Sequence, residues 1–292
     1  MIHERLDMAY WKSFFSLPRL RQAAGGKTPG ACIISGPYDI AVLEQLREAS
    51  YAHLSGIERV PTDVFVWSRG EPDQRAATKI GGLPYRVAER SWPIAPSGAT
   101  MTFAAQICFA DSRDIVPALP GDLLLIFTEA KNWGDEENSL YDFMGEAEED
   151  SSLLFEWTSR TPRPLVTRQD IPETGLPIMP CYGSIHRSWD YPYVDGFAYP
   201  GITQHIPPVF EATKIGGVCP WRDEESYGTQ GYLCSLSSLS NKISQPFPFV
   251  NVPEPISWNE WRHSSPLMIG DVGLINLFLN NDGSVRWTFH GH

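Results

Sequence analysis

Residues 77–82 read Ala-Thr-Lys-Ile-Gly-Gly, and residues 212–217 repeat the same six amino acids almost half a chain length later. Each copy is followed, further along, by Gly-Asp and an apolar run, at residues 121–127 and 270–278. Several motifs that recur in the same order are typical of an internal repeat. The sequence therefore predicts two related modules in one chain.

The composition is that of a folded protein rich in turns. Of the 292 residues, 42% are hydrophobic and 12% are aromatic, which is enough apolar surface for a packed core. The 25 Pro and 24 Gly favour short strands joined by turns over long helices. The expected fold class is α+β, with internally duplicated, mainly antiparallel β modules and a few peripheral helices.

The net charge and the cysteine content limit the possible binding partners and cellular compartments. The formal net charge is −12, which argues against nucleic acid because phosphate binding needs a basic surface. The five Cys are scattered without C-x-x-C spacing, as expected of free thiols in a reducing compartment. The N-terminus is charged where a secretory signal is apolar, and no run reaches the roughly 20 apolar residues of a membrane span. We expect a cytoplasmic protein with no membrane contact.

The chain order predicts four segments. Their expected bounds are 1–75 for an N-terminal segment that contains helices, 76–160 for the first module, 161–211 for a connector rich in Pro and aromatic residues, and 212–292 for the second module. Apolar residues at helical spacing predict helices over 3–20 and 39–54. The first helix could instead lie on a membrane surface, but its charges are mixed rather than rich in Lys and Arg.

Strands are predicted where apolar residues alternate or run together between turns. The expected strands are 31–35, 64–67, 103–109, 123–127, 153–157, 232–236, 274–279 and 285–289. Strand 103–109 should bury one face and place Gln106 on the other. Residues 280–283 form a tight hairpin turn in the second module, whereas the first module has an acidic loop, 129–151, at the corresponding place.

Several of these motifs resemble the YwqG-like family of bacterial proteins of unknown function. They are Lys79-Ile80-Gly81-Gly82 with Pro84, Trp92-Pro93, residues 103–107, Gly121 with residues 123–127, and, in the second module, residues 214–217 and 270–278. The resemblance spans about residues 76–128 and 212–292, and residues 1–60 match no part of it. It implies an α+β protein with an internal duplication, and no established activity, cofactor or catalytic residue. An association of such domains with toxin-neutralising systems favours an interaction role.

The repeated turns are the first candidate for a ligand site. Paired Gly residues let the backbone approach an anion, and the adjacent Lys could hold it. The candidate ligand-binding residues are Lys79, Gly81, Gly82, Gln106, Lys214, Gly216, Gly217 and Asp271. The alternative is a turn that starts a strand in each module and leaves its Lys in solvent. For Asp122 and Asp271, the pattern favours carboxylates that accept N–H bonds within a turn over catalytic acids.

No complete catalytic or metal-binding signature occurs in the sequence. His290 and His292 have the spacing that could chelate a metal on one face of a strand, but no third ligand can be named. A G-x-S-x-G nucleophile elbow and a dinucleotide-binding glycine motif are both missing. We therefore expect no catalytic residue, no metal and no cofactor, and lean against an enzyme.

The acidic loop 129–151 is the segment that the fold least requires. It holds nine acidic residues and one Lys, with apolar residues among them that could dock a partner. Disorder is the alternative. The candidate partner-binding residues are Asp135, Glu136, Glu137, Tyr141, Phe143 and Glu148. We expect a non-catalytic binding protein, of immunity type for example, that docks a basic protein. The alternative is a small-molecule-binding protein or hydrolase with its site between the modules.

Overall fold

The computed structural model describes residue 56 and residues 58–129, 153–173, 180–190, 212–220, 231–238, 269 and 273–290, and the structural statements below concern these residues. They form ten strands and two short 3-10 turns, and no α-helix occurs among them. The predicted α+β class is therefore wrong, because the described chain is nearly all β. The helices expected at 3–20 and 39–54 and the strand expected at 31–35 lie outside the described residues.

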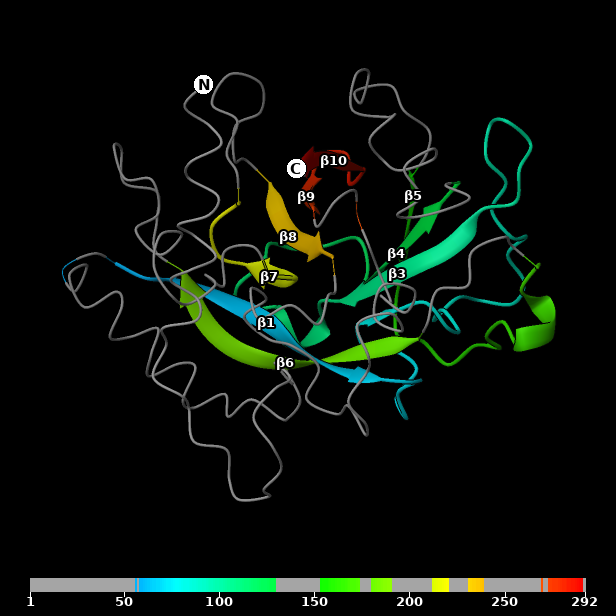
Figure 1. The fold of residues 1–292 in the computed structure, drawn as a ribbon, viewed down its shortest axis with the longest axis horizontal. Helices are drawn as coiled ribbons and strands as arrows, with labels where there is room; N and C mark the ends of the chain where they lie inside the picture. The colour runs from blue at the N-terminus through cyan, green and yellow to red at the C-terminus, as the bar shows by residue number, and fades with distance from the viewer. Residues whose placement is uncertain are drawn as a thin grey trace, which may run out of the picture.

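The strands belong to one antiparallel sheet. They are β1 (Val60–Arg69), β2 (Lys79–Ile80), β3 (Thr102–Cys108), β4 (Leu123–Thr128), β5 (Leu153–Thr158), β6 (Cys181–Asp190), β7 (Lys214–Gly216), β8 (Tyr232–Ser237), β9 (Leu274–Leu279) and β10 (Val285–His290). The strand order is β10-β9-β8-β7-β1-β6-β2-β3-β4-β5 (Figure 1). The 3-10 turns are η2 (Ala110–Ser112) and η4 (Arg168–Asp170).

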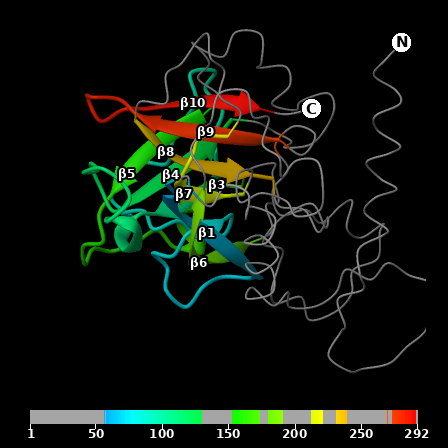
Figure 2. The same cartoon turned by 90° about the vertical axis from the view of Figure 1, so that its left-hand side faces the viewer.

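The sheet curls until it is nearly closed and barrel-like (Figure 2). The two edge strands of the sheet, β10 and β5, approach each other. The indole Nε1 of Trp157 on β5 donates a hydrogen bond of 3.1 Å to the carbonyl oxygen of Gly283, in the turn between β9 and β10. This bond joins the two ends of the strand order.

The strand order is symmetric about its centre. Strands β10, β9, β8 and β7 on one side correspond to β5, β4, β3 and β2 on the other, and β1 and β6 form the centre. β1 pairs with β6 over its whole length, from Val60 opposite Asp190 to Arg69 opposite Cys181 (Figure 1). On its other edge, β1 pairs with β7, which comes later in the chain. β6 pairs on its other edge with β2, which comes earlier in the chain.

The two central strands fall in segments that were not expected to be part of a module. β1 lies within the predicted N-terminal segment, and β6 lies within the predicted connector. The expected strand 64–67 is the middle of β1, and β6 was not expected as a strand. We call β2–β5 the first half and β7–β10 the second half from here on.

The main core lies inside the curled sheet. The first half contributes Ile107 and Leu124 to it, the second half contributes Leu236 and Leu277, and β1 contributes Phe65. Burial of such side chains is the main favourable term in folding, at about 25 cal/mol per Å² of apolar surface removed from water. The same core therefore holds both halves together.

Strand β3 is buried along all seven residues, which corrects the expectation of a single buried face. Its outer face carries a second apolar cluster, of Ala95, Met101, Phe103, Leu125 and Phe127. Trp92 covers this cluster, since its Nε1 donates to the carbonyl oxygen of Met101 at 2.7 Å and its ring meets that of Phe127 edge-on. The chain around residues 92–101 thus folds back over β3 and β4.

Most of the strand predictions are confirmed. β3, β4, β5, β8, β9 and β10 lie where alternation or apolar runs predicted strands, and β4 pairs with β5. The hairpin turn at residues 280–283 is also confirmed, with φ of 85° at Gly283. The short strands β2 and β7, inside the repeated motif itself, were not predicted as strands.

Candidate functional site

Each repeated motif places a Lys on a short inner strand and two Gly residues after it. The φ values are 62° and 70° at Gly81 and Gly82, and 67° and 73° at Gly216 and Gly217. Gly adopts such positive φ values without strain, which explains why both copies carry a Gly pair. Turns of this kind can direct backbone N–H groups toward an anion.

In the first copy, the anion is a carboxylate of the protein itself. Oε2 of Glu71, just after β1, accepts a hydrogen bond of 3.2 Å from Nζ of Lys79. Oε1 of Glu71 accepts one of 2.8 Å from the backbone N–H of Leu83. A Cβ at position 82 would overlap this carboxylate, so Gly82 is needed for its close approach. We call Glu71, Lys79 and Leu83 the Glu71 clamp.

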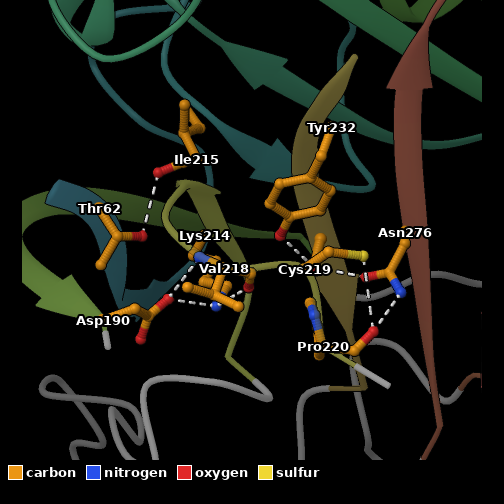
Figure 3. A network of polar contacts seen from close by, with 10 residues as sticks. Thr62, Asp190, Lys214, Ile215, Val218, Cys219, Pro220, Tyr232 and Asn276 are labelled. Atoms are coloured by element: carbon orange, nitrogen blue, oxygen red, sulfur yellow. Dashed lines mark hydrogen bonds and ion pairs between the residues drawn. The ribbon is translucent and has the colours of Figure 1, made fainter. Parts of the chain in front are cut away.

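In the second copy, Asp190 at the end of β6 takes the corresponding place (Figure 3). Its Oδ2 accepts hydrogen bonds from Nζ of Lys214 at 2.6 Å and from the backbone N–H of Val218 at 3.0 Å. Nζ of Lys214 also donates to the carbonyl oxygen of Val218 at 2.7 Å. A Cβ at Gly217 would overlap Oδ2 of Asp190. We call Asp190, Lys214 and Val218 the Asp190 clamp.

The two clamps differ in their exposure to solvent. The side chains of Lys214 and Asp190 are 0% and 4% exposed, whereas those of Lys79 and Glu71 are 1% and 39% exposed. Burial lowers the pKa of Lys79 because desolvation disfavours its charged form, and the nearby carboxylate of Glu71 opposes this effect. The expectation that the motif's Lys lies in solvent is therefore wrong in both copies.

Gln106 lies opposite Lys79 in the sheet and fastens the chain on either side of the first motif. Its Oε1 accepts a hydrogen bond from the backbone N–H of Tyr85 at 2.8 Å. Its Nε2 donates to the carbonyl oxygens of Ala77 at 2.6 Å and Arg75 at 2.9 Å. Gln106 is fully buried, and these bonds satisfy its amide.

In the second half, a network of side chains fastens the chain after the motif (Figure 3). Nδ2 of Asn276 on β9 donates to the carbonyl oxygen of Pro220 at 2.9 Å, and its Oδ1 accepts from Oγ of Ser235 at 2.7 Å. The hydroxyls of Ser235 and Tyr232 share a hydrogen bond of 2.6 Å. Burial raises the pKa of Tyr232, because the phenolate would lose its hydration. Tyr232 therefore stays protonated at neutral pH.

The predicted ligand-binding residues form two separate groups. Lys79, Gly81, Gly82 and Gln106 lie together at β2 and β3, and Lys214, Gly216 and Gly217 lie at β7, with β6 and β1 between the groups. Asp271 and the predicted partner-binding residues Asp135, Glu136, Glu137, Tyr141, Phe143 and Glu148 lie outside the described residues. A ligand-binding role for any of these residues stays a prediction.

Asp122 is a hydrogen-bond acceptor, but its donors lie outside its own turn, which differs from the predicted N–H bonds within the turn. Its Oδ2 accepts from the backbone N–H of Arg160 at 2.9 Å, and its Oδ1 accepts from Nη2 of Arg113 at 3.0 Å. The Arg160 N–H and then the Arg113 guanidinium lower the pKa of Asp122, because both stabilise the carboxylate.

Two ion pairs that each contain one buried partner, Arg86 and Asp63, were not predicted from the sequence. Nε and Nη2 of Arg86 donate to the two carboxylate oxygens of Glu156, at 2.7 Å and 3.0 Å. Asp63 on β1 accepts hydrogen bonds from Arg187 on β6 and, at 2.6 Å, from Oγ of Ser112. The charged partners are 70 and 124 residues apart, so no local pattern could have paired them.

Metal chemistry finds no support in the part of the chain that the structure describes. No group of three or more His, Cys, Asp or Glu side chains there could hold a metal ion. Of the candidate pair of histidines, His290 ends β10 and His292 lies outside the described residues. Separately, no helix among the described residues is long and apolar enough to cross a membrane.

Part of the chain matches a known family of protein domains. Residues 78–165 match the model of a domain of unknown function, DUF1963, which covers the first half of the sheet from its repeated motif through β5. No curated protein matches the chain. The match agrees with the expectation of an uncharacterised family, and the more particular YwqG-like name is not part of it.

Proposed function

We propose that this protein is a non-catalytic binding protein that docks a basic protein partner through the acidic segment between β4 and β5. The observation that carries the proposal is the contrast between two corresponding hairpins. Residues 280–284 suffice to join β9 to β10, whereas residues 129–152 join β4 to β5. The longer connection has nine acidic residues and one Lys, a net −8 of the chain's −12. Such concentrated charge attracts and steers a partner of opposite sign.

The bonding of the charged side chains in the sheet supports binding over catalysis. Lys214 and Asp63 are fully buried, and Lys79 and Arg86 are almost so. Each of them pairs with an oppositely charged side chain. A general acid or base must reach the proton that it transfers, and these groups are instead used to satisfy one another. They are bonded in the way that structural ion pairs are.

We also infer that the two halves arose by duplication of one unit. The mirrored strand order, the repeated motifs and the two clamps support this origin. The acidic segment is then an insertion in one copy. Two buried free thiols, Cys108 and Cys234, support the reducing cytoplasm as the setting, where an immunity-type module would meet its partner.

A loop graft tests the proposal. The variant replaces residues 129–152 by the sequence of residues 280–284, because these segments join corresponding strands. We expect it to fold with an unchanged circular dichroism spectrum and to lose binding to a poly-lysine peptide and to basic proteins of a cell lysate. Binding to the wild-type protein should weaken steeply with salt, since surface charges are screened over about 8 Å at physiological ionic strength.

A matched control separates charge from length. It keeps all residues of the segment but replaces Asp135, Glu136, Glu137 and Glu148 by Asn or Gln. We expect an intermediate loss of binding, because half of the segment's net charge remains. Equal capture of basic proteins by the wild type and the loop graft would overturn the proposal.

A further inference from the structure

The two clamps hold a carboxylate with the same donors, but only the Glu71 clamp is open to solvent. Glu71 belongs to the irregular segment after β1, and its hydrogen bond with the N–H of Leu83 lies at the exposed surface. Asp190 is the last residue of a strand and is buried. An exposed side chain on an irregular segment can turn away, whereas a buried strand residue cannot do so without opening the sheet.

The oxygen atoms are also arranged differently. The Glu71 clamp places one carboxylate oxygen on the ammonium of Lys79 and the other on the N–H of Leu83. In the Asp190 clamp, a single oxygen, Oδ2, takes both donors. The two donors of the Glu71 clamp are therefore spaced for the two oxygens of one carboxylate, in the bidentate manner that favours such groups.

Lys79 has more donor capacity than Glu71 uses. An ammonium group carries three N–H donors. Among the described residues, Nζ of Lys79 has one hydrogen-bond acceptor, at 3.2 Å, although the side chain is buried. Nζ of Lys214 has acceptors at 2.6 Å and 2.7 Å. The buried ammonium of Lys79 is thus held less tightly than its counterpart in the second half.

A second cation stands near the same carboxylate. The charge of Glu71 acts on Arg75 as well as on Lys79. Nε of Arg75 is buried and has no hydrogen-bond partner among the residues that the structure describes. Two cations therefore act on one partly exposed carboxylate, and they would attract an external carboxylate that replaced it.

We propose that the Glu71 clamp is an exchangeable carboxylate site. Glu71 occupies it as an internal ligand, and a carboxylate from solvent takes its place between Nζ of Lys79 and the N–H of Leu83 when the side chain of Glu71 turns outward. Backbone N–H groups of this kind capture the terminal carboxylates of peptides in other recognition sites. The external ligand is a free carboxylate, either of a small organic acid or of a peptide C-terminus.

Glu71 competes with an external carboxylate for the site and therefore raises the concentration at which the external carboxylate binds. Because Glu71 is tethered next to its site, it competes as a ligand of high effective concentration. Removal of its carboxylate should therefore lower the dissociation constant of an external carboxylate by at least about tenfold. The proposal concerns other residues than those of the acidic segment, so each proposal can fail without the other.

Glu71→Ala, in the full chain, tests the exchange. We expect sodium acetate, up to roughly 100 mM, to raise the melting temperature of this variant more than sodium chloride of equal ionic strength, as for any ligand that binds the folded state. The backbone amide signal of Leu83 should shift with acetate in NMR spectra. Wild-type protein should show both responses only at about tenfold higher acetate.

Asp190→Ala is the matched control, because it removes the carboxylate of the sealed clamp. We expect it to show no response to acetate beyond that to chloride. If Asp190→Ala does not fold, Glu71→Gln takes its place in the comparison, since the amide keeps an oxygen for Leu83 and should give a weaker response than Glu71→Ala. An acetate effect that is absent in Glu71→Ala, or equal to the control's, overturns the proposal.

Peptides distinguish the two sources of carboxylate. Triglycine with a free C-terminus and amidated triglycine differ only in the group that the site would hold. Tighter binding of free triglycine than of acetate assigns the site to a peptide C-terminus, and equal binding assigns it to a small acid. If amidated triglycine binds Glu71→Ala as well as free triglycine does, the site does not select a carboxylate and the proposal fails.

Discussion

The Glu71 clamp and the Asp190 clamp each pair a Lys ammonium and a backbone N–H with a carboxylate, but the carboxylates come from different parts of the chain. In both, a buried Lys and the backbone N–H after a Gly pair need an anion. The first takes a long side chain from an irregular segment 8 residues before the Lys, and the second takes a short side chain from a strand end 24 residues before it. The six repeated residues therefore specify an anion site, while residues outside the motif decide which anion fills it and how firmly.

The largest difference between the halves should appear when each carboxylate is removed. Asp190→Ala leaves the fully buried ammonium of Lys214 without its charge partner, and we expect a loss of about 3–5 kcal/mol in the free energy of unfolding. Glu71→Ala should cost only about 1 kcal/mol, because solvent screens the more exposed pair. Urea unfolding of both variants measures the two losses. Equal losses would show that exposure does not separate the clamps.

The next largest effect should come from the network behind the second clamp. Asn276→Leu leaves the hydroxyl of Ser235 and the carbonyl oxygen of Pro220 without the amide that bonds them, which should cost about 1–3 kcal/mol. Leu125 on β4 occupies the position that corresponds to Asn276 on β9, so a Leu side chain is expected to fit at position 276. Gln106→Leu is the matched change in the first half and should cost as much. A stability gain in Asn276→Leu would contradict a structural role for this network.

A smaller effect should appear in the alkaline range, at the first clamp. The pKa of Lys79 is lowered in the folded state, so between that pKa and the ordinary value of about 10.4 the unfolded chain binds more protons than the folded one. The stability of the wild type should therefore rise relative to Lys79→Met as the pH increases through this range. Urea unfolding of both proteins from pH 8 to pH 10 measures the difference. A difference that falls with pH would contradict the lowered pKa.

The smallest effect should appear in acid, at the turn of Asp122. Its pKa is lowered in the folded state, so its stabilisation is complete above the unfolded value of about 3.9 and is lost as the pH falls through the folded value. Asp122→Asn should be less stable than the wild type at neutral pH, by less than about 1 kcal/mol because solvent screens its partly exposed pair with Arg113. The two proteins should converge at low pH, and a gap that persists at pH 2 would contradict the assignment.

Local patterns were sufficient for the strands and turns that they encode. Alternating or continuous apolar residues located β3, β4 and β8–β10, and Asp-Gly located the turn after β9. The predicted α+β fold class was nevertheless wrong. The helices were predicted only in segments outside the described residues, and a Pro-rich stretch that contains β6 was taken as a connector. Polar residues within β6, such as Ser184 and Arg187, hid a central strand.

The partners of charged groups could not be predicted, for a different reason. The Gly pair indicated where backbone N–H groups could meet an anion, but Glu71 and Asp190 do not stand at matching distances from their motifs. Only the pairing of β1 with β6 and β7 brings Asp190 to Lys214. Contacts that depend on the pairing of distant strands leave no local pattern, and the ion pairs of Arg86 and Asp63 are further cases.

The central position of β1 has a consequence for the order of events during synthesis. β1 ends at residue 69, but its two neighbours begin at residues 181 and 214. At about 5–20 residues per second, a ribosome needs roughly 6–22 s to go from the end of β1 to the start of β6, and both edges of β1 lack their partners in that time. We expect β1 to be protected late, and pulsed hydrogen exchange during refolding should show its amides protected no earlier than those of β6. A nascent chain of this design depends on its last third to shield a strand made in its first.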